Sequence, residues 1–139
     1  MNFHETKERP DGHYNSFRTQ WWDASFVYGQ DEEQVKSSRL YKDGKMKINE
    51  ANPDTLAHRP DGTDVTGDNS NSWAGVTVLQ VIFLKEHNYC ADIIKKENPN
   101  LSDEEIYGYC RNIIAALTAK IHTIDWTCEL LKTEQLRIA

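Results

Sequence analysis

Apolar positions divide the chain into a first half without regular periodicity and a second half with helical periodicity. Residues 1–71 are rich in Gly, Pro, Asn, Asp and Ser, and they sustain neither a helix period nor a strand period. Asp43-Gly44 lies between two short alternating runs, which is the usual pattern of a two-residue β-hairpin turn. The pattern therefore predicts a loop-rich segment that contains a short β-hairpin at residues 40–48.

From residue 72 onward the pattern predicts two long helices. Residues 73–84 are apolar on nearly all sides, which is typical of a helix in the centre of a larger protein, and Asn98-Pro99 ends this helix. Ser102 and Glu105 have the spacing of a capping box, and the second helix should run from there to about Lys132. Its expected apolar face consists of Ile113, Leu117, Ile121, Ile124, Cys128 and Leu131. Two helices cannot cover all of this apolar surface between them.

Composition and charge exclude several classes of protein. The 139 residues suffice for one domain, and 16 basic against 22 acidic residues give a net charge of −6, which argues against a nucleic-acid partner. We find no apolar run long enough for a membrane span and no secretory signal. Cys90, Cys110 and Cys128 are widely spaced in apolar contexts, so we expect free buried thiols and an intracellular, cytoplasmic location.

Residues 119–132 place polar side chains in a segment that is apolar enough to be buried. A buried polar group without a hydrogen bond costs roughly 1–3 kcal/mol. His122 therefore either pairs with Asp125 or Glu129 within the helix, or binds a ligand together with Thr127. Five residues of an ideal α-helix separate these two side chains by about 140°. Either the ligand lies across the helix, or the helix ends or distorts near Thr127.

Seven motifs follow one another along the chain. They are Arg-Thr-Gln-Trp-Trp-Asp-Ala-Ser at 18–25, Tyr28-Gly29, Tyr-Lys-Asp-Gly-Lys at 41–45, Gly67-Asp68, Asn-Ser-Trp-Ala-Gly at 71–75, Leu-Lys-Glu-His-Asn at 84–88 and Ala-Lys-Ile-His-Thr-Ile-Asp-Trp-Thr at 119–127. In this order they resemble the motifs of the fatty acid alpha-dioxygenases, which are haem proteins of the peroxidase–cyclooxygenase superfamily. The Lys-Glu-His-Asn element is similar to the Arg-Glu-His-Asn helix of mammalian-type peroxidases and cyclooxygenases, and His-Thr-Ile-Asp-Trp-Thr resembles the alpha-dioxygenase branch alone.

The resemblance implies a mainly α fold that forms part of the helical animal-type haem peroxidase fold. Residues 1–139 would be a partial haem peroxidase/alpha-dioxygenase domain. Within it, residues 1–71 would form the loop-rich region with a calcium loop and a hairpin, and residues 72–139 would form two core helices.

The resemblance also implies an activity, namely the addition of O2 at the alpha carbon of a long-chain fatty acid to give a 2-hydroperoxy acid. In the family, a peroxide activator oxidises the haem, which generates a tyrosyl radical that abstracts the hydrogen from carbon 2. The family's order places the haem ligands and the radical tyrosine outside this chain. We therefore expect an enzyme fragment that is inactive alone, with possible peripheral lipid association. The alternative is a small stand-alone helical module that binds fatty acid or protein without catalysis.

Thr19, Trp21, Asp23 and Ser25 match the family's calcium loop. Alternate residues of an extended segment face the same side, so two hydroxyls, a carboxylate and the Trp21 carbonyl could converge on a hard cation. The plainer alternative is a tryptophan-anchored loop in which Asp23 caps a turn.

His122 and Thr127 match the family residues that hold the fatty acid carboxylate, and an imidazole with a hydroxyl suits that role. Ser70 replaces the arginine that the family usually carries before its Asn-Ser-Trp motif, which puts peroxide activation in doubt. Glu86, His87 and Cys90 share one helix without a second ligand cluster, so no zinc site is expected. His87 should instead pack between helices.

Overall fold

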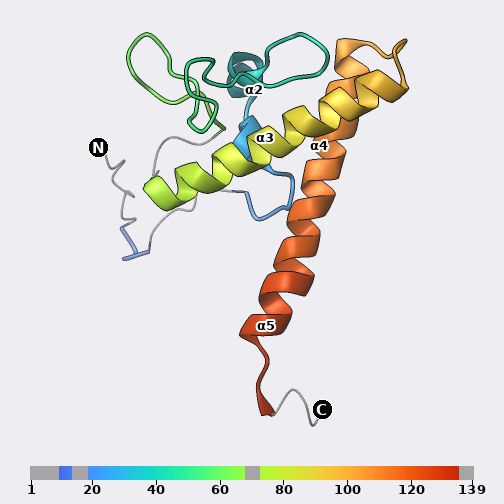
Figure 1. Ribbon diagram of the computed structural model, residues 1–139. Helices are drawn as coiled ribbons and strands as arrows, with labels where there is room; N and C mark the ends of the chain where they lie inside the picture. The colour runs from blue at the N-terminus through green and yellow to red at the C-terminus, as the bar shows by residue number, and fades with distance from the viewer. Residues whose placement is uncertain (1–9, 14–18, 68–72, 135–139) are drawn as a thin grey trace.

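The computed structural model describes residues 10–13, 19–67 and 73–134, and this part of the chain is helical without any strand. The prediction of a mainly α fold is confirmed. Figure 1 shows α3 crossing α4 near the start of α4, with the loops of the first half gathered on one side. The elements are α1 (Ser25–Tyr28), α2 (Glu32–Ser38), α3 (Ala74–Glu97), α4 (Asp103–Lys120), the π-helix η1 (Ile121–Thr127) and α5 (Cys128–Leu130).

Local signals correctly place both ends of α3 and the start of α4. The second helix is predicted to run to about Lys132, whereas α4 ends at Lys120 and the winding continues through η1 and α5 to Leu130. The Ser102 hydroxyl accepts a hydrogen bond from the Glu105 amide at 3.3 Å, and the Glu105 carboxylate accepts one from the Ser102 amide at 2.9 Å. This capping box satisfies amides that the first turn of α4 would otherwise leave unpaired. At the end of α3, the Asn98 amide donates to the Ile94 carbonyl at 2.8 Å.

The buried face of α4 is not the predicted one. The side chains that α4 buries follow the spacing of a single helix face, and they are Ile106, Tyr107, Cys110 and Ile114. Ile113 and Ile124 from the predicted face are 43% and 56% exposed. Periodicity alone could not identify the buried face, because it depends on where α3 and the loops pack against the helix.

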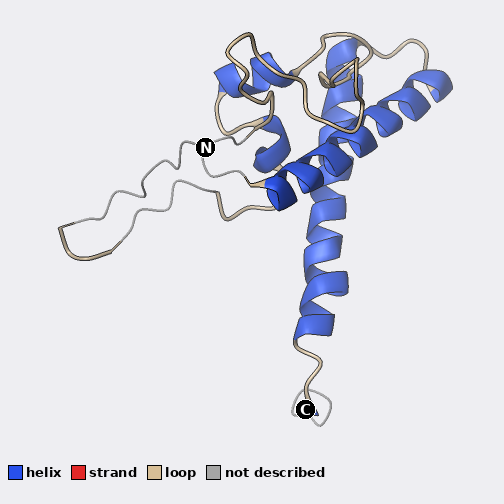
Figure 2. Cartoon of the chain, turned by 60° about the vertical axis from the view of Figure 1, so that its left-hand side comes forward, coloured by secondary structure: helices blue, strands red, loops and turns tan. Residues whose placement is uncertain are grey.

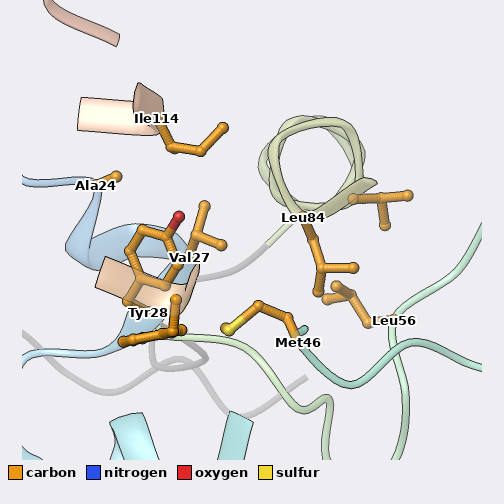
Figure 3. Close-up of a cluster of buried hydrophobic side chains, with 9 residues drawn as sticks. Ala24, Val27, Tyr28, Met46, Leu56, Leu84 and Ile114 are labelled. Carbon is orange, nitrogen blue, oxygen red and sulfur yellow. The ribbon is translucent and has the colours of Figure 1, made fainter. Parts of the chain in front are cut away.

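The main core joins the two halves of the chain (Figure 3). Val27 and Tyr28 of α1, together with Met46 and Leu56 of the loops, pack against Leu84 of α3 in one buried cluster, which also includes Ile114 of α4. Burying a large apolar side chain stabilises a fold by about 1.5–3 kcal/mol. The irregular first half is therefore structural and not a separate appendage.

The predicted β-hairpin is wrong, although its turn forms. Asp43 and Gly44 both have positive φ, 52° and 72°, as a type I′ turn requires. The flanking residues make only one isolated antiparallel bridge, between Arg39 and Met46. On its outer edge, Met46 bonds to the Asn88 side chain, which accepts from the Met46 amide at 2.8 Å and donates to the Met46 carbonyl at 3.1 Å.

Arg39 fastens the same loop to the start of α4. Its guanidinium donates to Glu104 at 2.6 Å and to Asp103 at 2.7 Å, and it lies over the Tyr107 ring at 3.9 Å from the centroid. Two carboxylates in the first turn of a helix also suit the helix dipole. Desolvation of the buried Arg39 side chain acts to lower its pKa. The hydrogen bonds and charges of Glu104 and Asp103 outweigh this effect, so the pKa of Arg39 is raised.

Residues 121–131 are exposed apart from the partly buried Thr127, although their apolar content suggested burial. Both views show the helix running on beyond α3 and the loops (Figures 1 and 2). Ile124, Trp126 and Leu130 are 56%, 61% and 65% exposed. Of the described helices, none is long and apolar enough to cross a membrane.

The three cysteines are free thiols, as predicted, but they are not all buried. Cys110 is buried and Cys90 is partly buried, whereas Cys128 is exposed because it lies beyond the end of the packed region. Burial raises the pKa of the Cys110 thiol to about 12, so this thiol stays protonated and unreactive at neutral pH.

Candidate functional site

The helix changes its winding from α to π just before His122, and both His122 and Thr127 lie in the π-helical segment. Residues Ile121–Thr127 form a π-helix, in which backbone hydrogen bonds join residues five apart. A residue five positions on therefore lies about one turn further along, much closer to the same face than the 140° of an α-helix. The sequence left open whether a ligand lies across the helix or the helix ends or distorts near Thr127, and the structure has the distorted helix.

The Thr127 hydroxyl contributes to this distortion. It donates to the His122 carbonyl at 2.6 Å, and the Cys128 thiol donates to the Thr123 carbonyl at 3.5 Å. Both side chains thus bond to carbonyls five residues earlier. To donate to a ligand, the Thr127 hydroxyl must rotate away from the His122 carbonyl, because it carries only one proton.

The His122 ring packs against Trp22 and not against a carboxylate of its own helix. The ring centroids are 5.3 Å apart, with an interplanar angle of 47°. Asp125 instead pairs with Lys120 at 3.3 Å, and Glu129 pairs with Lys132 at 3.2 Å. The internal pair that the sequence allowed for His122 is therefore not formed within the described residues, and its ring is exposed to solvent.

The four residues of the predicted calcium loop line one hollow of about 240 Å³, which also has Thr118 of α4 in its wall. Two of their oxygens already accept backbone hydrogen bonds. Asp23 accepts from the Ser25 amide at 3.0 Å, and Thr19 accepts from the Trp21 amide at 3.1 Å. The turn-capping alternative for Asp23 is thus present in the structure.

These hydrogen bonds do not consume the oxygens, because a carboxylate and a hydroxyl both have further lone pairs. The donor set suits a hard cation in kind, whereas Ca²⁺ takes six to eight oxygens and this loop offers four. No group of three or more His, Cys, Asp or Glu that could hold a metal ion occurs among the described residues. The loop contributes a single carboxylate, so it would not form such a group.

His87 is a buried structural histidine whose two ring nitrogens are both engaged. The Tyr28 hydroxyl lies 2.7 Å from Nδ1, and Nε2 lies 2.8 Å from the Gly44 carbonyl. Since a carbonyl only accepts, Nε2 carries the proton and Tyr28 donates to Nδ1. Burial lowers the pKa of His87, and nearby Arg39 adds to this effect. His87 therefore packs between elements, as predicted, and the hydrogen bonds explain why the position is polar.

Trp22 is the site residue that sequence reasoning missed. It lies in the loop before α1, 100 positions from the histidine that it contacts. The predicted calcium loop uses alternate residues, 19, 21, 23 and 25, and therefore leaves out Trp22. No sequence pattern indicates that this loop contacts η1. Ser70 and parts of three motifs, namely Arg18, Asp68 and Asn71-Ser72, lie outside the described residues.

A profile of the animal haem peroxidase family matches residues 1–138. Alpha-dioxygenase PIOX of Oryza sativa subsp. japonica is 51% identical across 100% of this chain and 23% of its own length. Alpha-dioxygenase PIOX of Pisum sativum is 50% identical across 98% of this chain and 22% of its own length. The chain thus spans less than a quarter of these relatives.

Solved structures agree with these relatives. A crystal structure of Oryza sativa fatty acid alpha-dioxygenase, a variant with palmitic acid, superposes with a TM-score of 0.80 at 53% identity, over 91% of this chain and 20% of that one. The Arabidopsis thaliana enzyme gives a TM-score of 0.79 at 50% identity, over 86% of this chain and 18% of that one. The packed helices, the family profile and these likenesses agree: the chain belongs to the animal haem peroxidase family and is similar in sequence and fold to its fatty acid alpha-dioxygenases.

Proposed function

We propose that this chain is part of a haem-dependent fatty acid alpha-dioxygenase and that η1 binds the carboxylate of the substrate. The observation that carries the proposal is the π-helix, which brings His122 and Thr127 toward one face. An imidazole N–H and a rotated Thr127 hydroxyl would both donate to carboxylate oxygens, and hydrogen bonds to a charged acceptor are the stronger kind. The exposed side chains of Ile121, Ile124 and Trp126 offer apolar surface for the alkyl chain.

Two of the described histidines, His58 and His87, do not fit the role of a haem ligand. His87 is fully buried with both nitrogens engaged, and His58 pairs with Asp64 at 2.8 Å. Haem binding in this family would therefore depend on segments of the relatives that this chain does not match. On this proposal the chain binds and orients the acid, while O2 addition and peroxide activation need those segments. We also infer an intracellular location with peripheral lipid association.

Binding of [1-¹³C]octanoate to the chain, followed by NMR, tests the proposal, with octan-1-ol as the probe that lacks the carboxylate. We expect His122→Ala to weaken octanoate binding about three- to tenfold, the lower range for a charge-assisted hydrogen bond at an exposed site. Octanol binding should not change, because the alkyl surface is the same. His58→Ala is the matched control. Equal octanoate affinity in His122→Ala and the parent chain would reject the proposed role of η1.

We also propose that the loop with Thr19, Trp21, Asp23 and Ser25 binds calcium, supported by their convergence on one hollow. With four donors and one carboxylate, affinity should be weak, on the order of 10⁻⁴–10⁻³ M. Tryptophan fluorescence during a Ca²⁺ titration measures this affinity. Asp23→Asn should abolish the response while Asp31→Asn, at the start of α2, should leave it intact. A parent chain that shows no response up to about 10 mM Ca²⁺ would contradict the assignment.

A stand-alone fatty-acid-binding module is the alternative function. The observation in its favour is the core that joins both halves of the chain, from Val27 through Leu84 to Ile114. Complementation separates the two functions. If the chain is part of the dioxygenase, restoring it to the matching region of a relative should give 2-hydroperoxy acid from palmitate. Octanoate binding by the chain, together with an inactive hybrid that retains its haem, would favour the module.

A further inference from the structure

The ring contact between Trp22 and His122 joins two parts of the candidate site that are far apart in the sequence. Trp22 comes from the loop before α1, and His122 comes from the second residue of η1. Thr118 of α4, one helical turn before His122, lines the same hollow as the loop. The loop therefore rests on α4 at the point where its α-helical winding changes to π.

The loop that carries Trp22 is held firmly on its other side. Ala24 is only 2% exposed and belongs to the main core, and its positive φ of 55° turns the chain into α1. The Ser25 amide is bonded to Asp23, and the Gly29 amide is bonded to the Ser25 carbonyl at 2.8 Å. Trp22 itself remains 49% exposed, so its ring lies at the surface while the backbone that carries it is fixed by these contacts.

The His122 ring, by contrast, has little else to fix it. The described structure shows no hydrogen bond to its nitrogens, and its neighbours in η1 are exposed. An exposed histidine would sample several rotamers, and binding would have to restrict them. Packing against an indole restricts the ring before any ligand arrives, while its edge stays open to solvent.

We propose that Trp22 is a positioning residue that holds the His122 ring ready to donate to the substrate carboxylate. The inference rests on the proposed function of η1 and adds a determinant from outside the helix. Trp22 touches His122 and acts through it. Removing the indole should therefore weaken carboxylate binding without altering the π-helix.

The test uses the 139-residue chain and two readouts. The first is the chemical shift of the His122 ring protons, which the indole ring current displaces. The second is the affinity for [1-¹³C]octanoate, with octan-1-ol as the reference. We expect Trp22→Ala to move the His122 signals toward their free positions and to weaken octanoate binding about three- to tenfold, as expected for loss of an aromatic pair. Trp22→Phe should retain part of the displacement and most of the affinity.

Trp73→Ala is the matched control, since Trp73 is an exposed tryptophan at the start of α3 and away from η1. It should change neither readout. Unchanged His122 signals in Trp22→Ala would overturn the inference, as would moved signals with unchanged octanoate affinity. Both results leave the proposed function standing, because that function fails only if His122→Ala binds octanoate as the parent does.

Discussion

Both its backbone conformation and its close packing against α4 require a glycine at position 44. Its φ is +72°, and a Cβ added there would lie 2.6 Å from Ile106 Cγ2 and 2.7 Å from the Tyr107 amide nitrogen. We expect Gly44→Ala to lower the free energy of unfolding by about 2–4 kcal/mol, from backbone strain plus the clash with α4. Chemical denaturation measures the loss. Gly62→Ala is the control, because Gly62 also has positive φ, +82°, but faces open space. Equal losses in both variants would contradict the role of the clash.

His87 makes stability depend on pH at the residue scale. Burial lowers its pKa in the folded chain, so the unfolded chain takes up a proton first as the pH falls. Its contribution to stability is therefore complete above the unfolded pKa of about 6.5, and it is lost as the pH falls from there toward the lower folded pKa. We expect the free energy of unfolding to fall more between pH 7.5 and 5.5 in the parent than in His87→Gln. Parallel pH curves would show that His87 is not the group responsible.

At the scale of elements, the sequence predicted those features that depend on neighbouring residues, such as helix ends and turns. Asn98-Pro99 correctly marked the end of α3, the Ser102–Glu105 capping box the start of α4, and Asp43-Gly44 a turn. The hairpin prediction failed because the two arms of the turn pair at one bridge only, Arg39 with Met46, which is too little to form strands. The contact of Trp22 with His122 could not be predicted from the sequence either, because it depends on where the loop packs against the helix and not on the spacing of residues.

The π-helix is the element on which the candidate site depends, and the Thr127 side chain helps to hold it. We expect Thr127→Val to remove the hydroxyl bond to the His122 carbonyl and to speed amide exchange across residues 121–131 about fivefold, which corresponds to about 1 kcal/mol. Thr127→Ser keeps the hydroxyl and should exchange like the parent. Hydrogen exchange by NMR gives the rates residue by residue. If valine and serine behave alike, the backbone alone sets the π winding.

At the scale of the whole molecule, the described residues combine a buried main core with a large uncovered surface. The core forms where loops, α1, α3 and α4 meet, whereas the far end of α4 and all of η1 and α5 lie beyond it (Figure 2). The relatives are more than four times as long as the matched region. A helix with apolar side chains on more than one flank is what a central position in such a larger fold requires.

This uncovered surface should make the isolated chain associate with itself. Exposed apolar side chains in one continuous segment favour contacts between copies, so we expect the weight-average sedimentation coefficient to rise with concentration and the dye ANS to bind. Ile124→Lys should reduce both effects, because Ile124 is 56% exposed in the middle of η1. Thr123→Lys is the matched control, since it adds the same charge to the neighbouring exposed position without removing apolar surface. If both lysine variants reduce association equally, charge repulsion accounts for the change. A parent chain that stays monomeric and binds no ANS would show that this surface does not drive self-association.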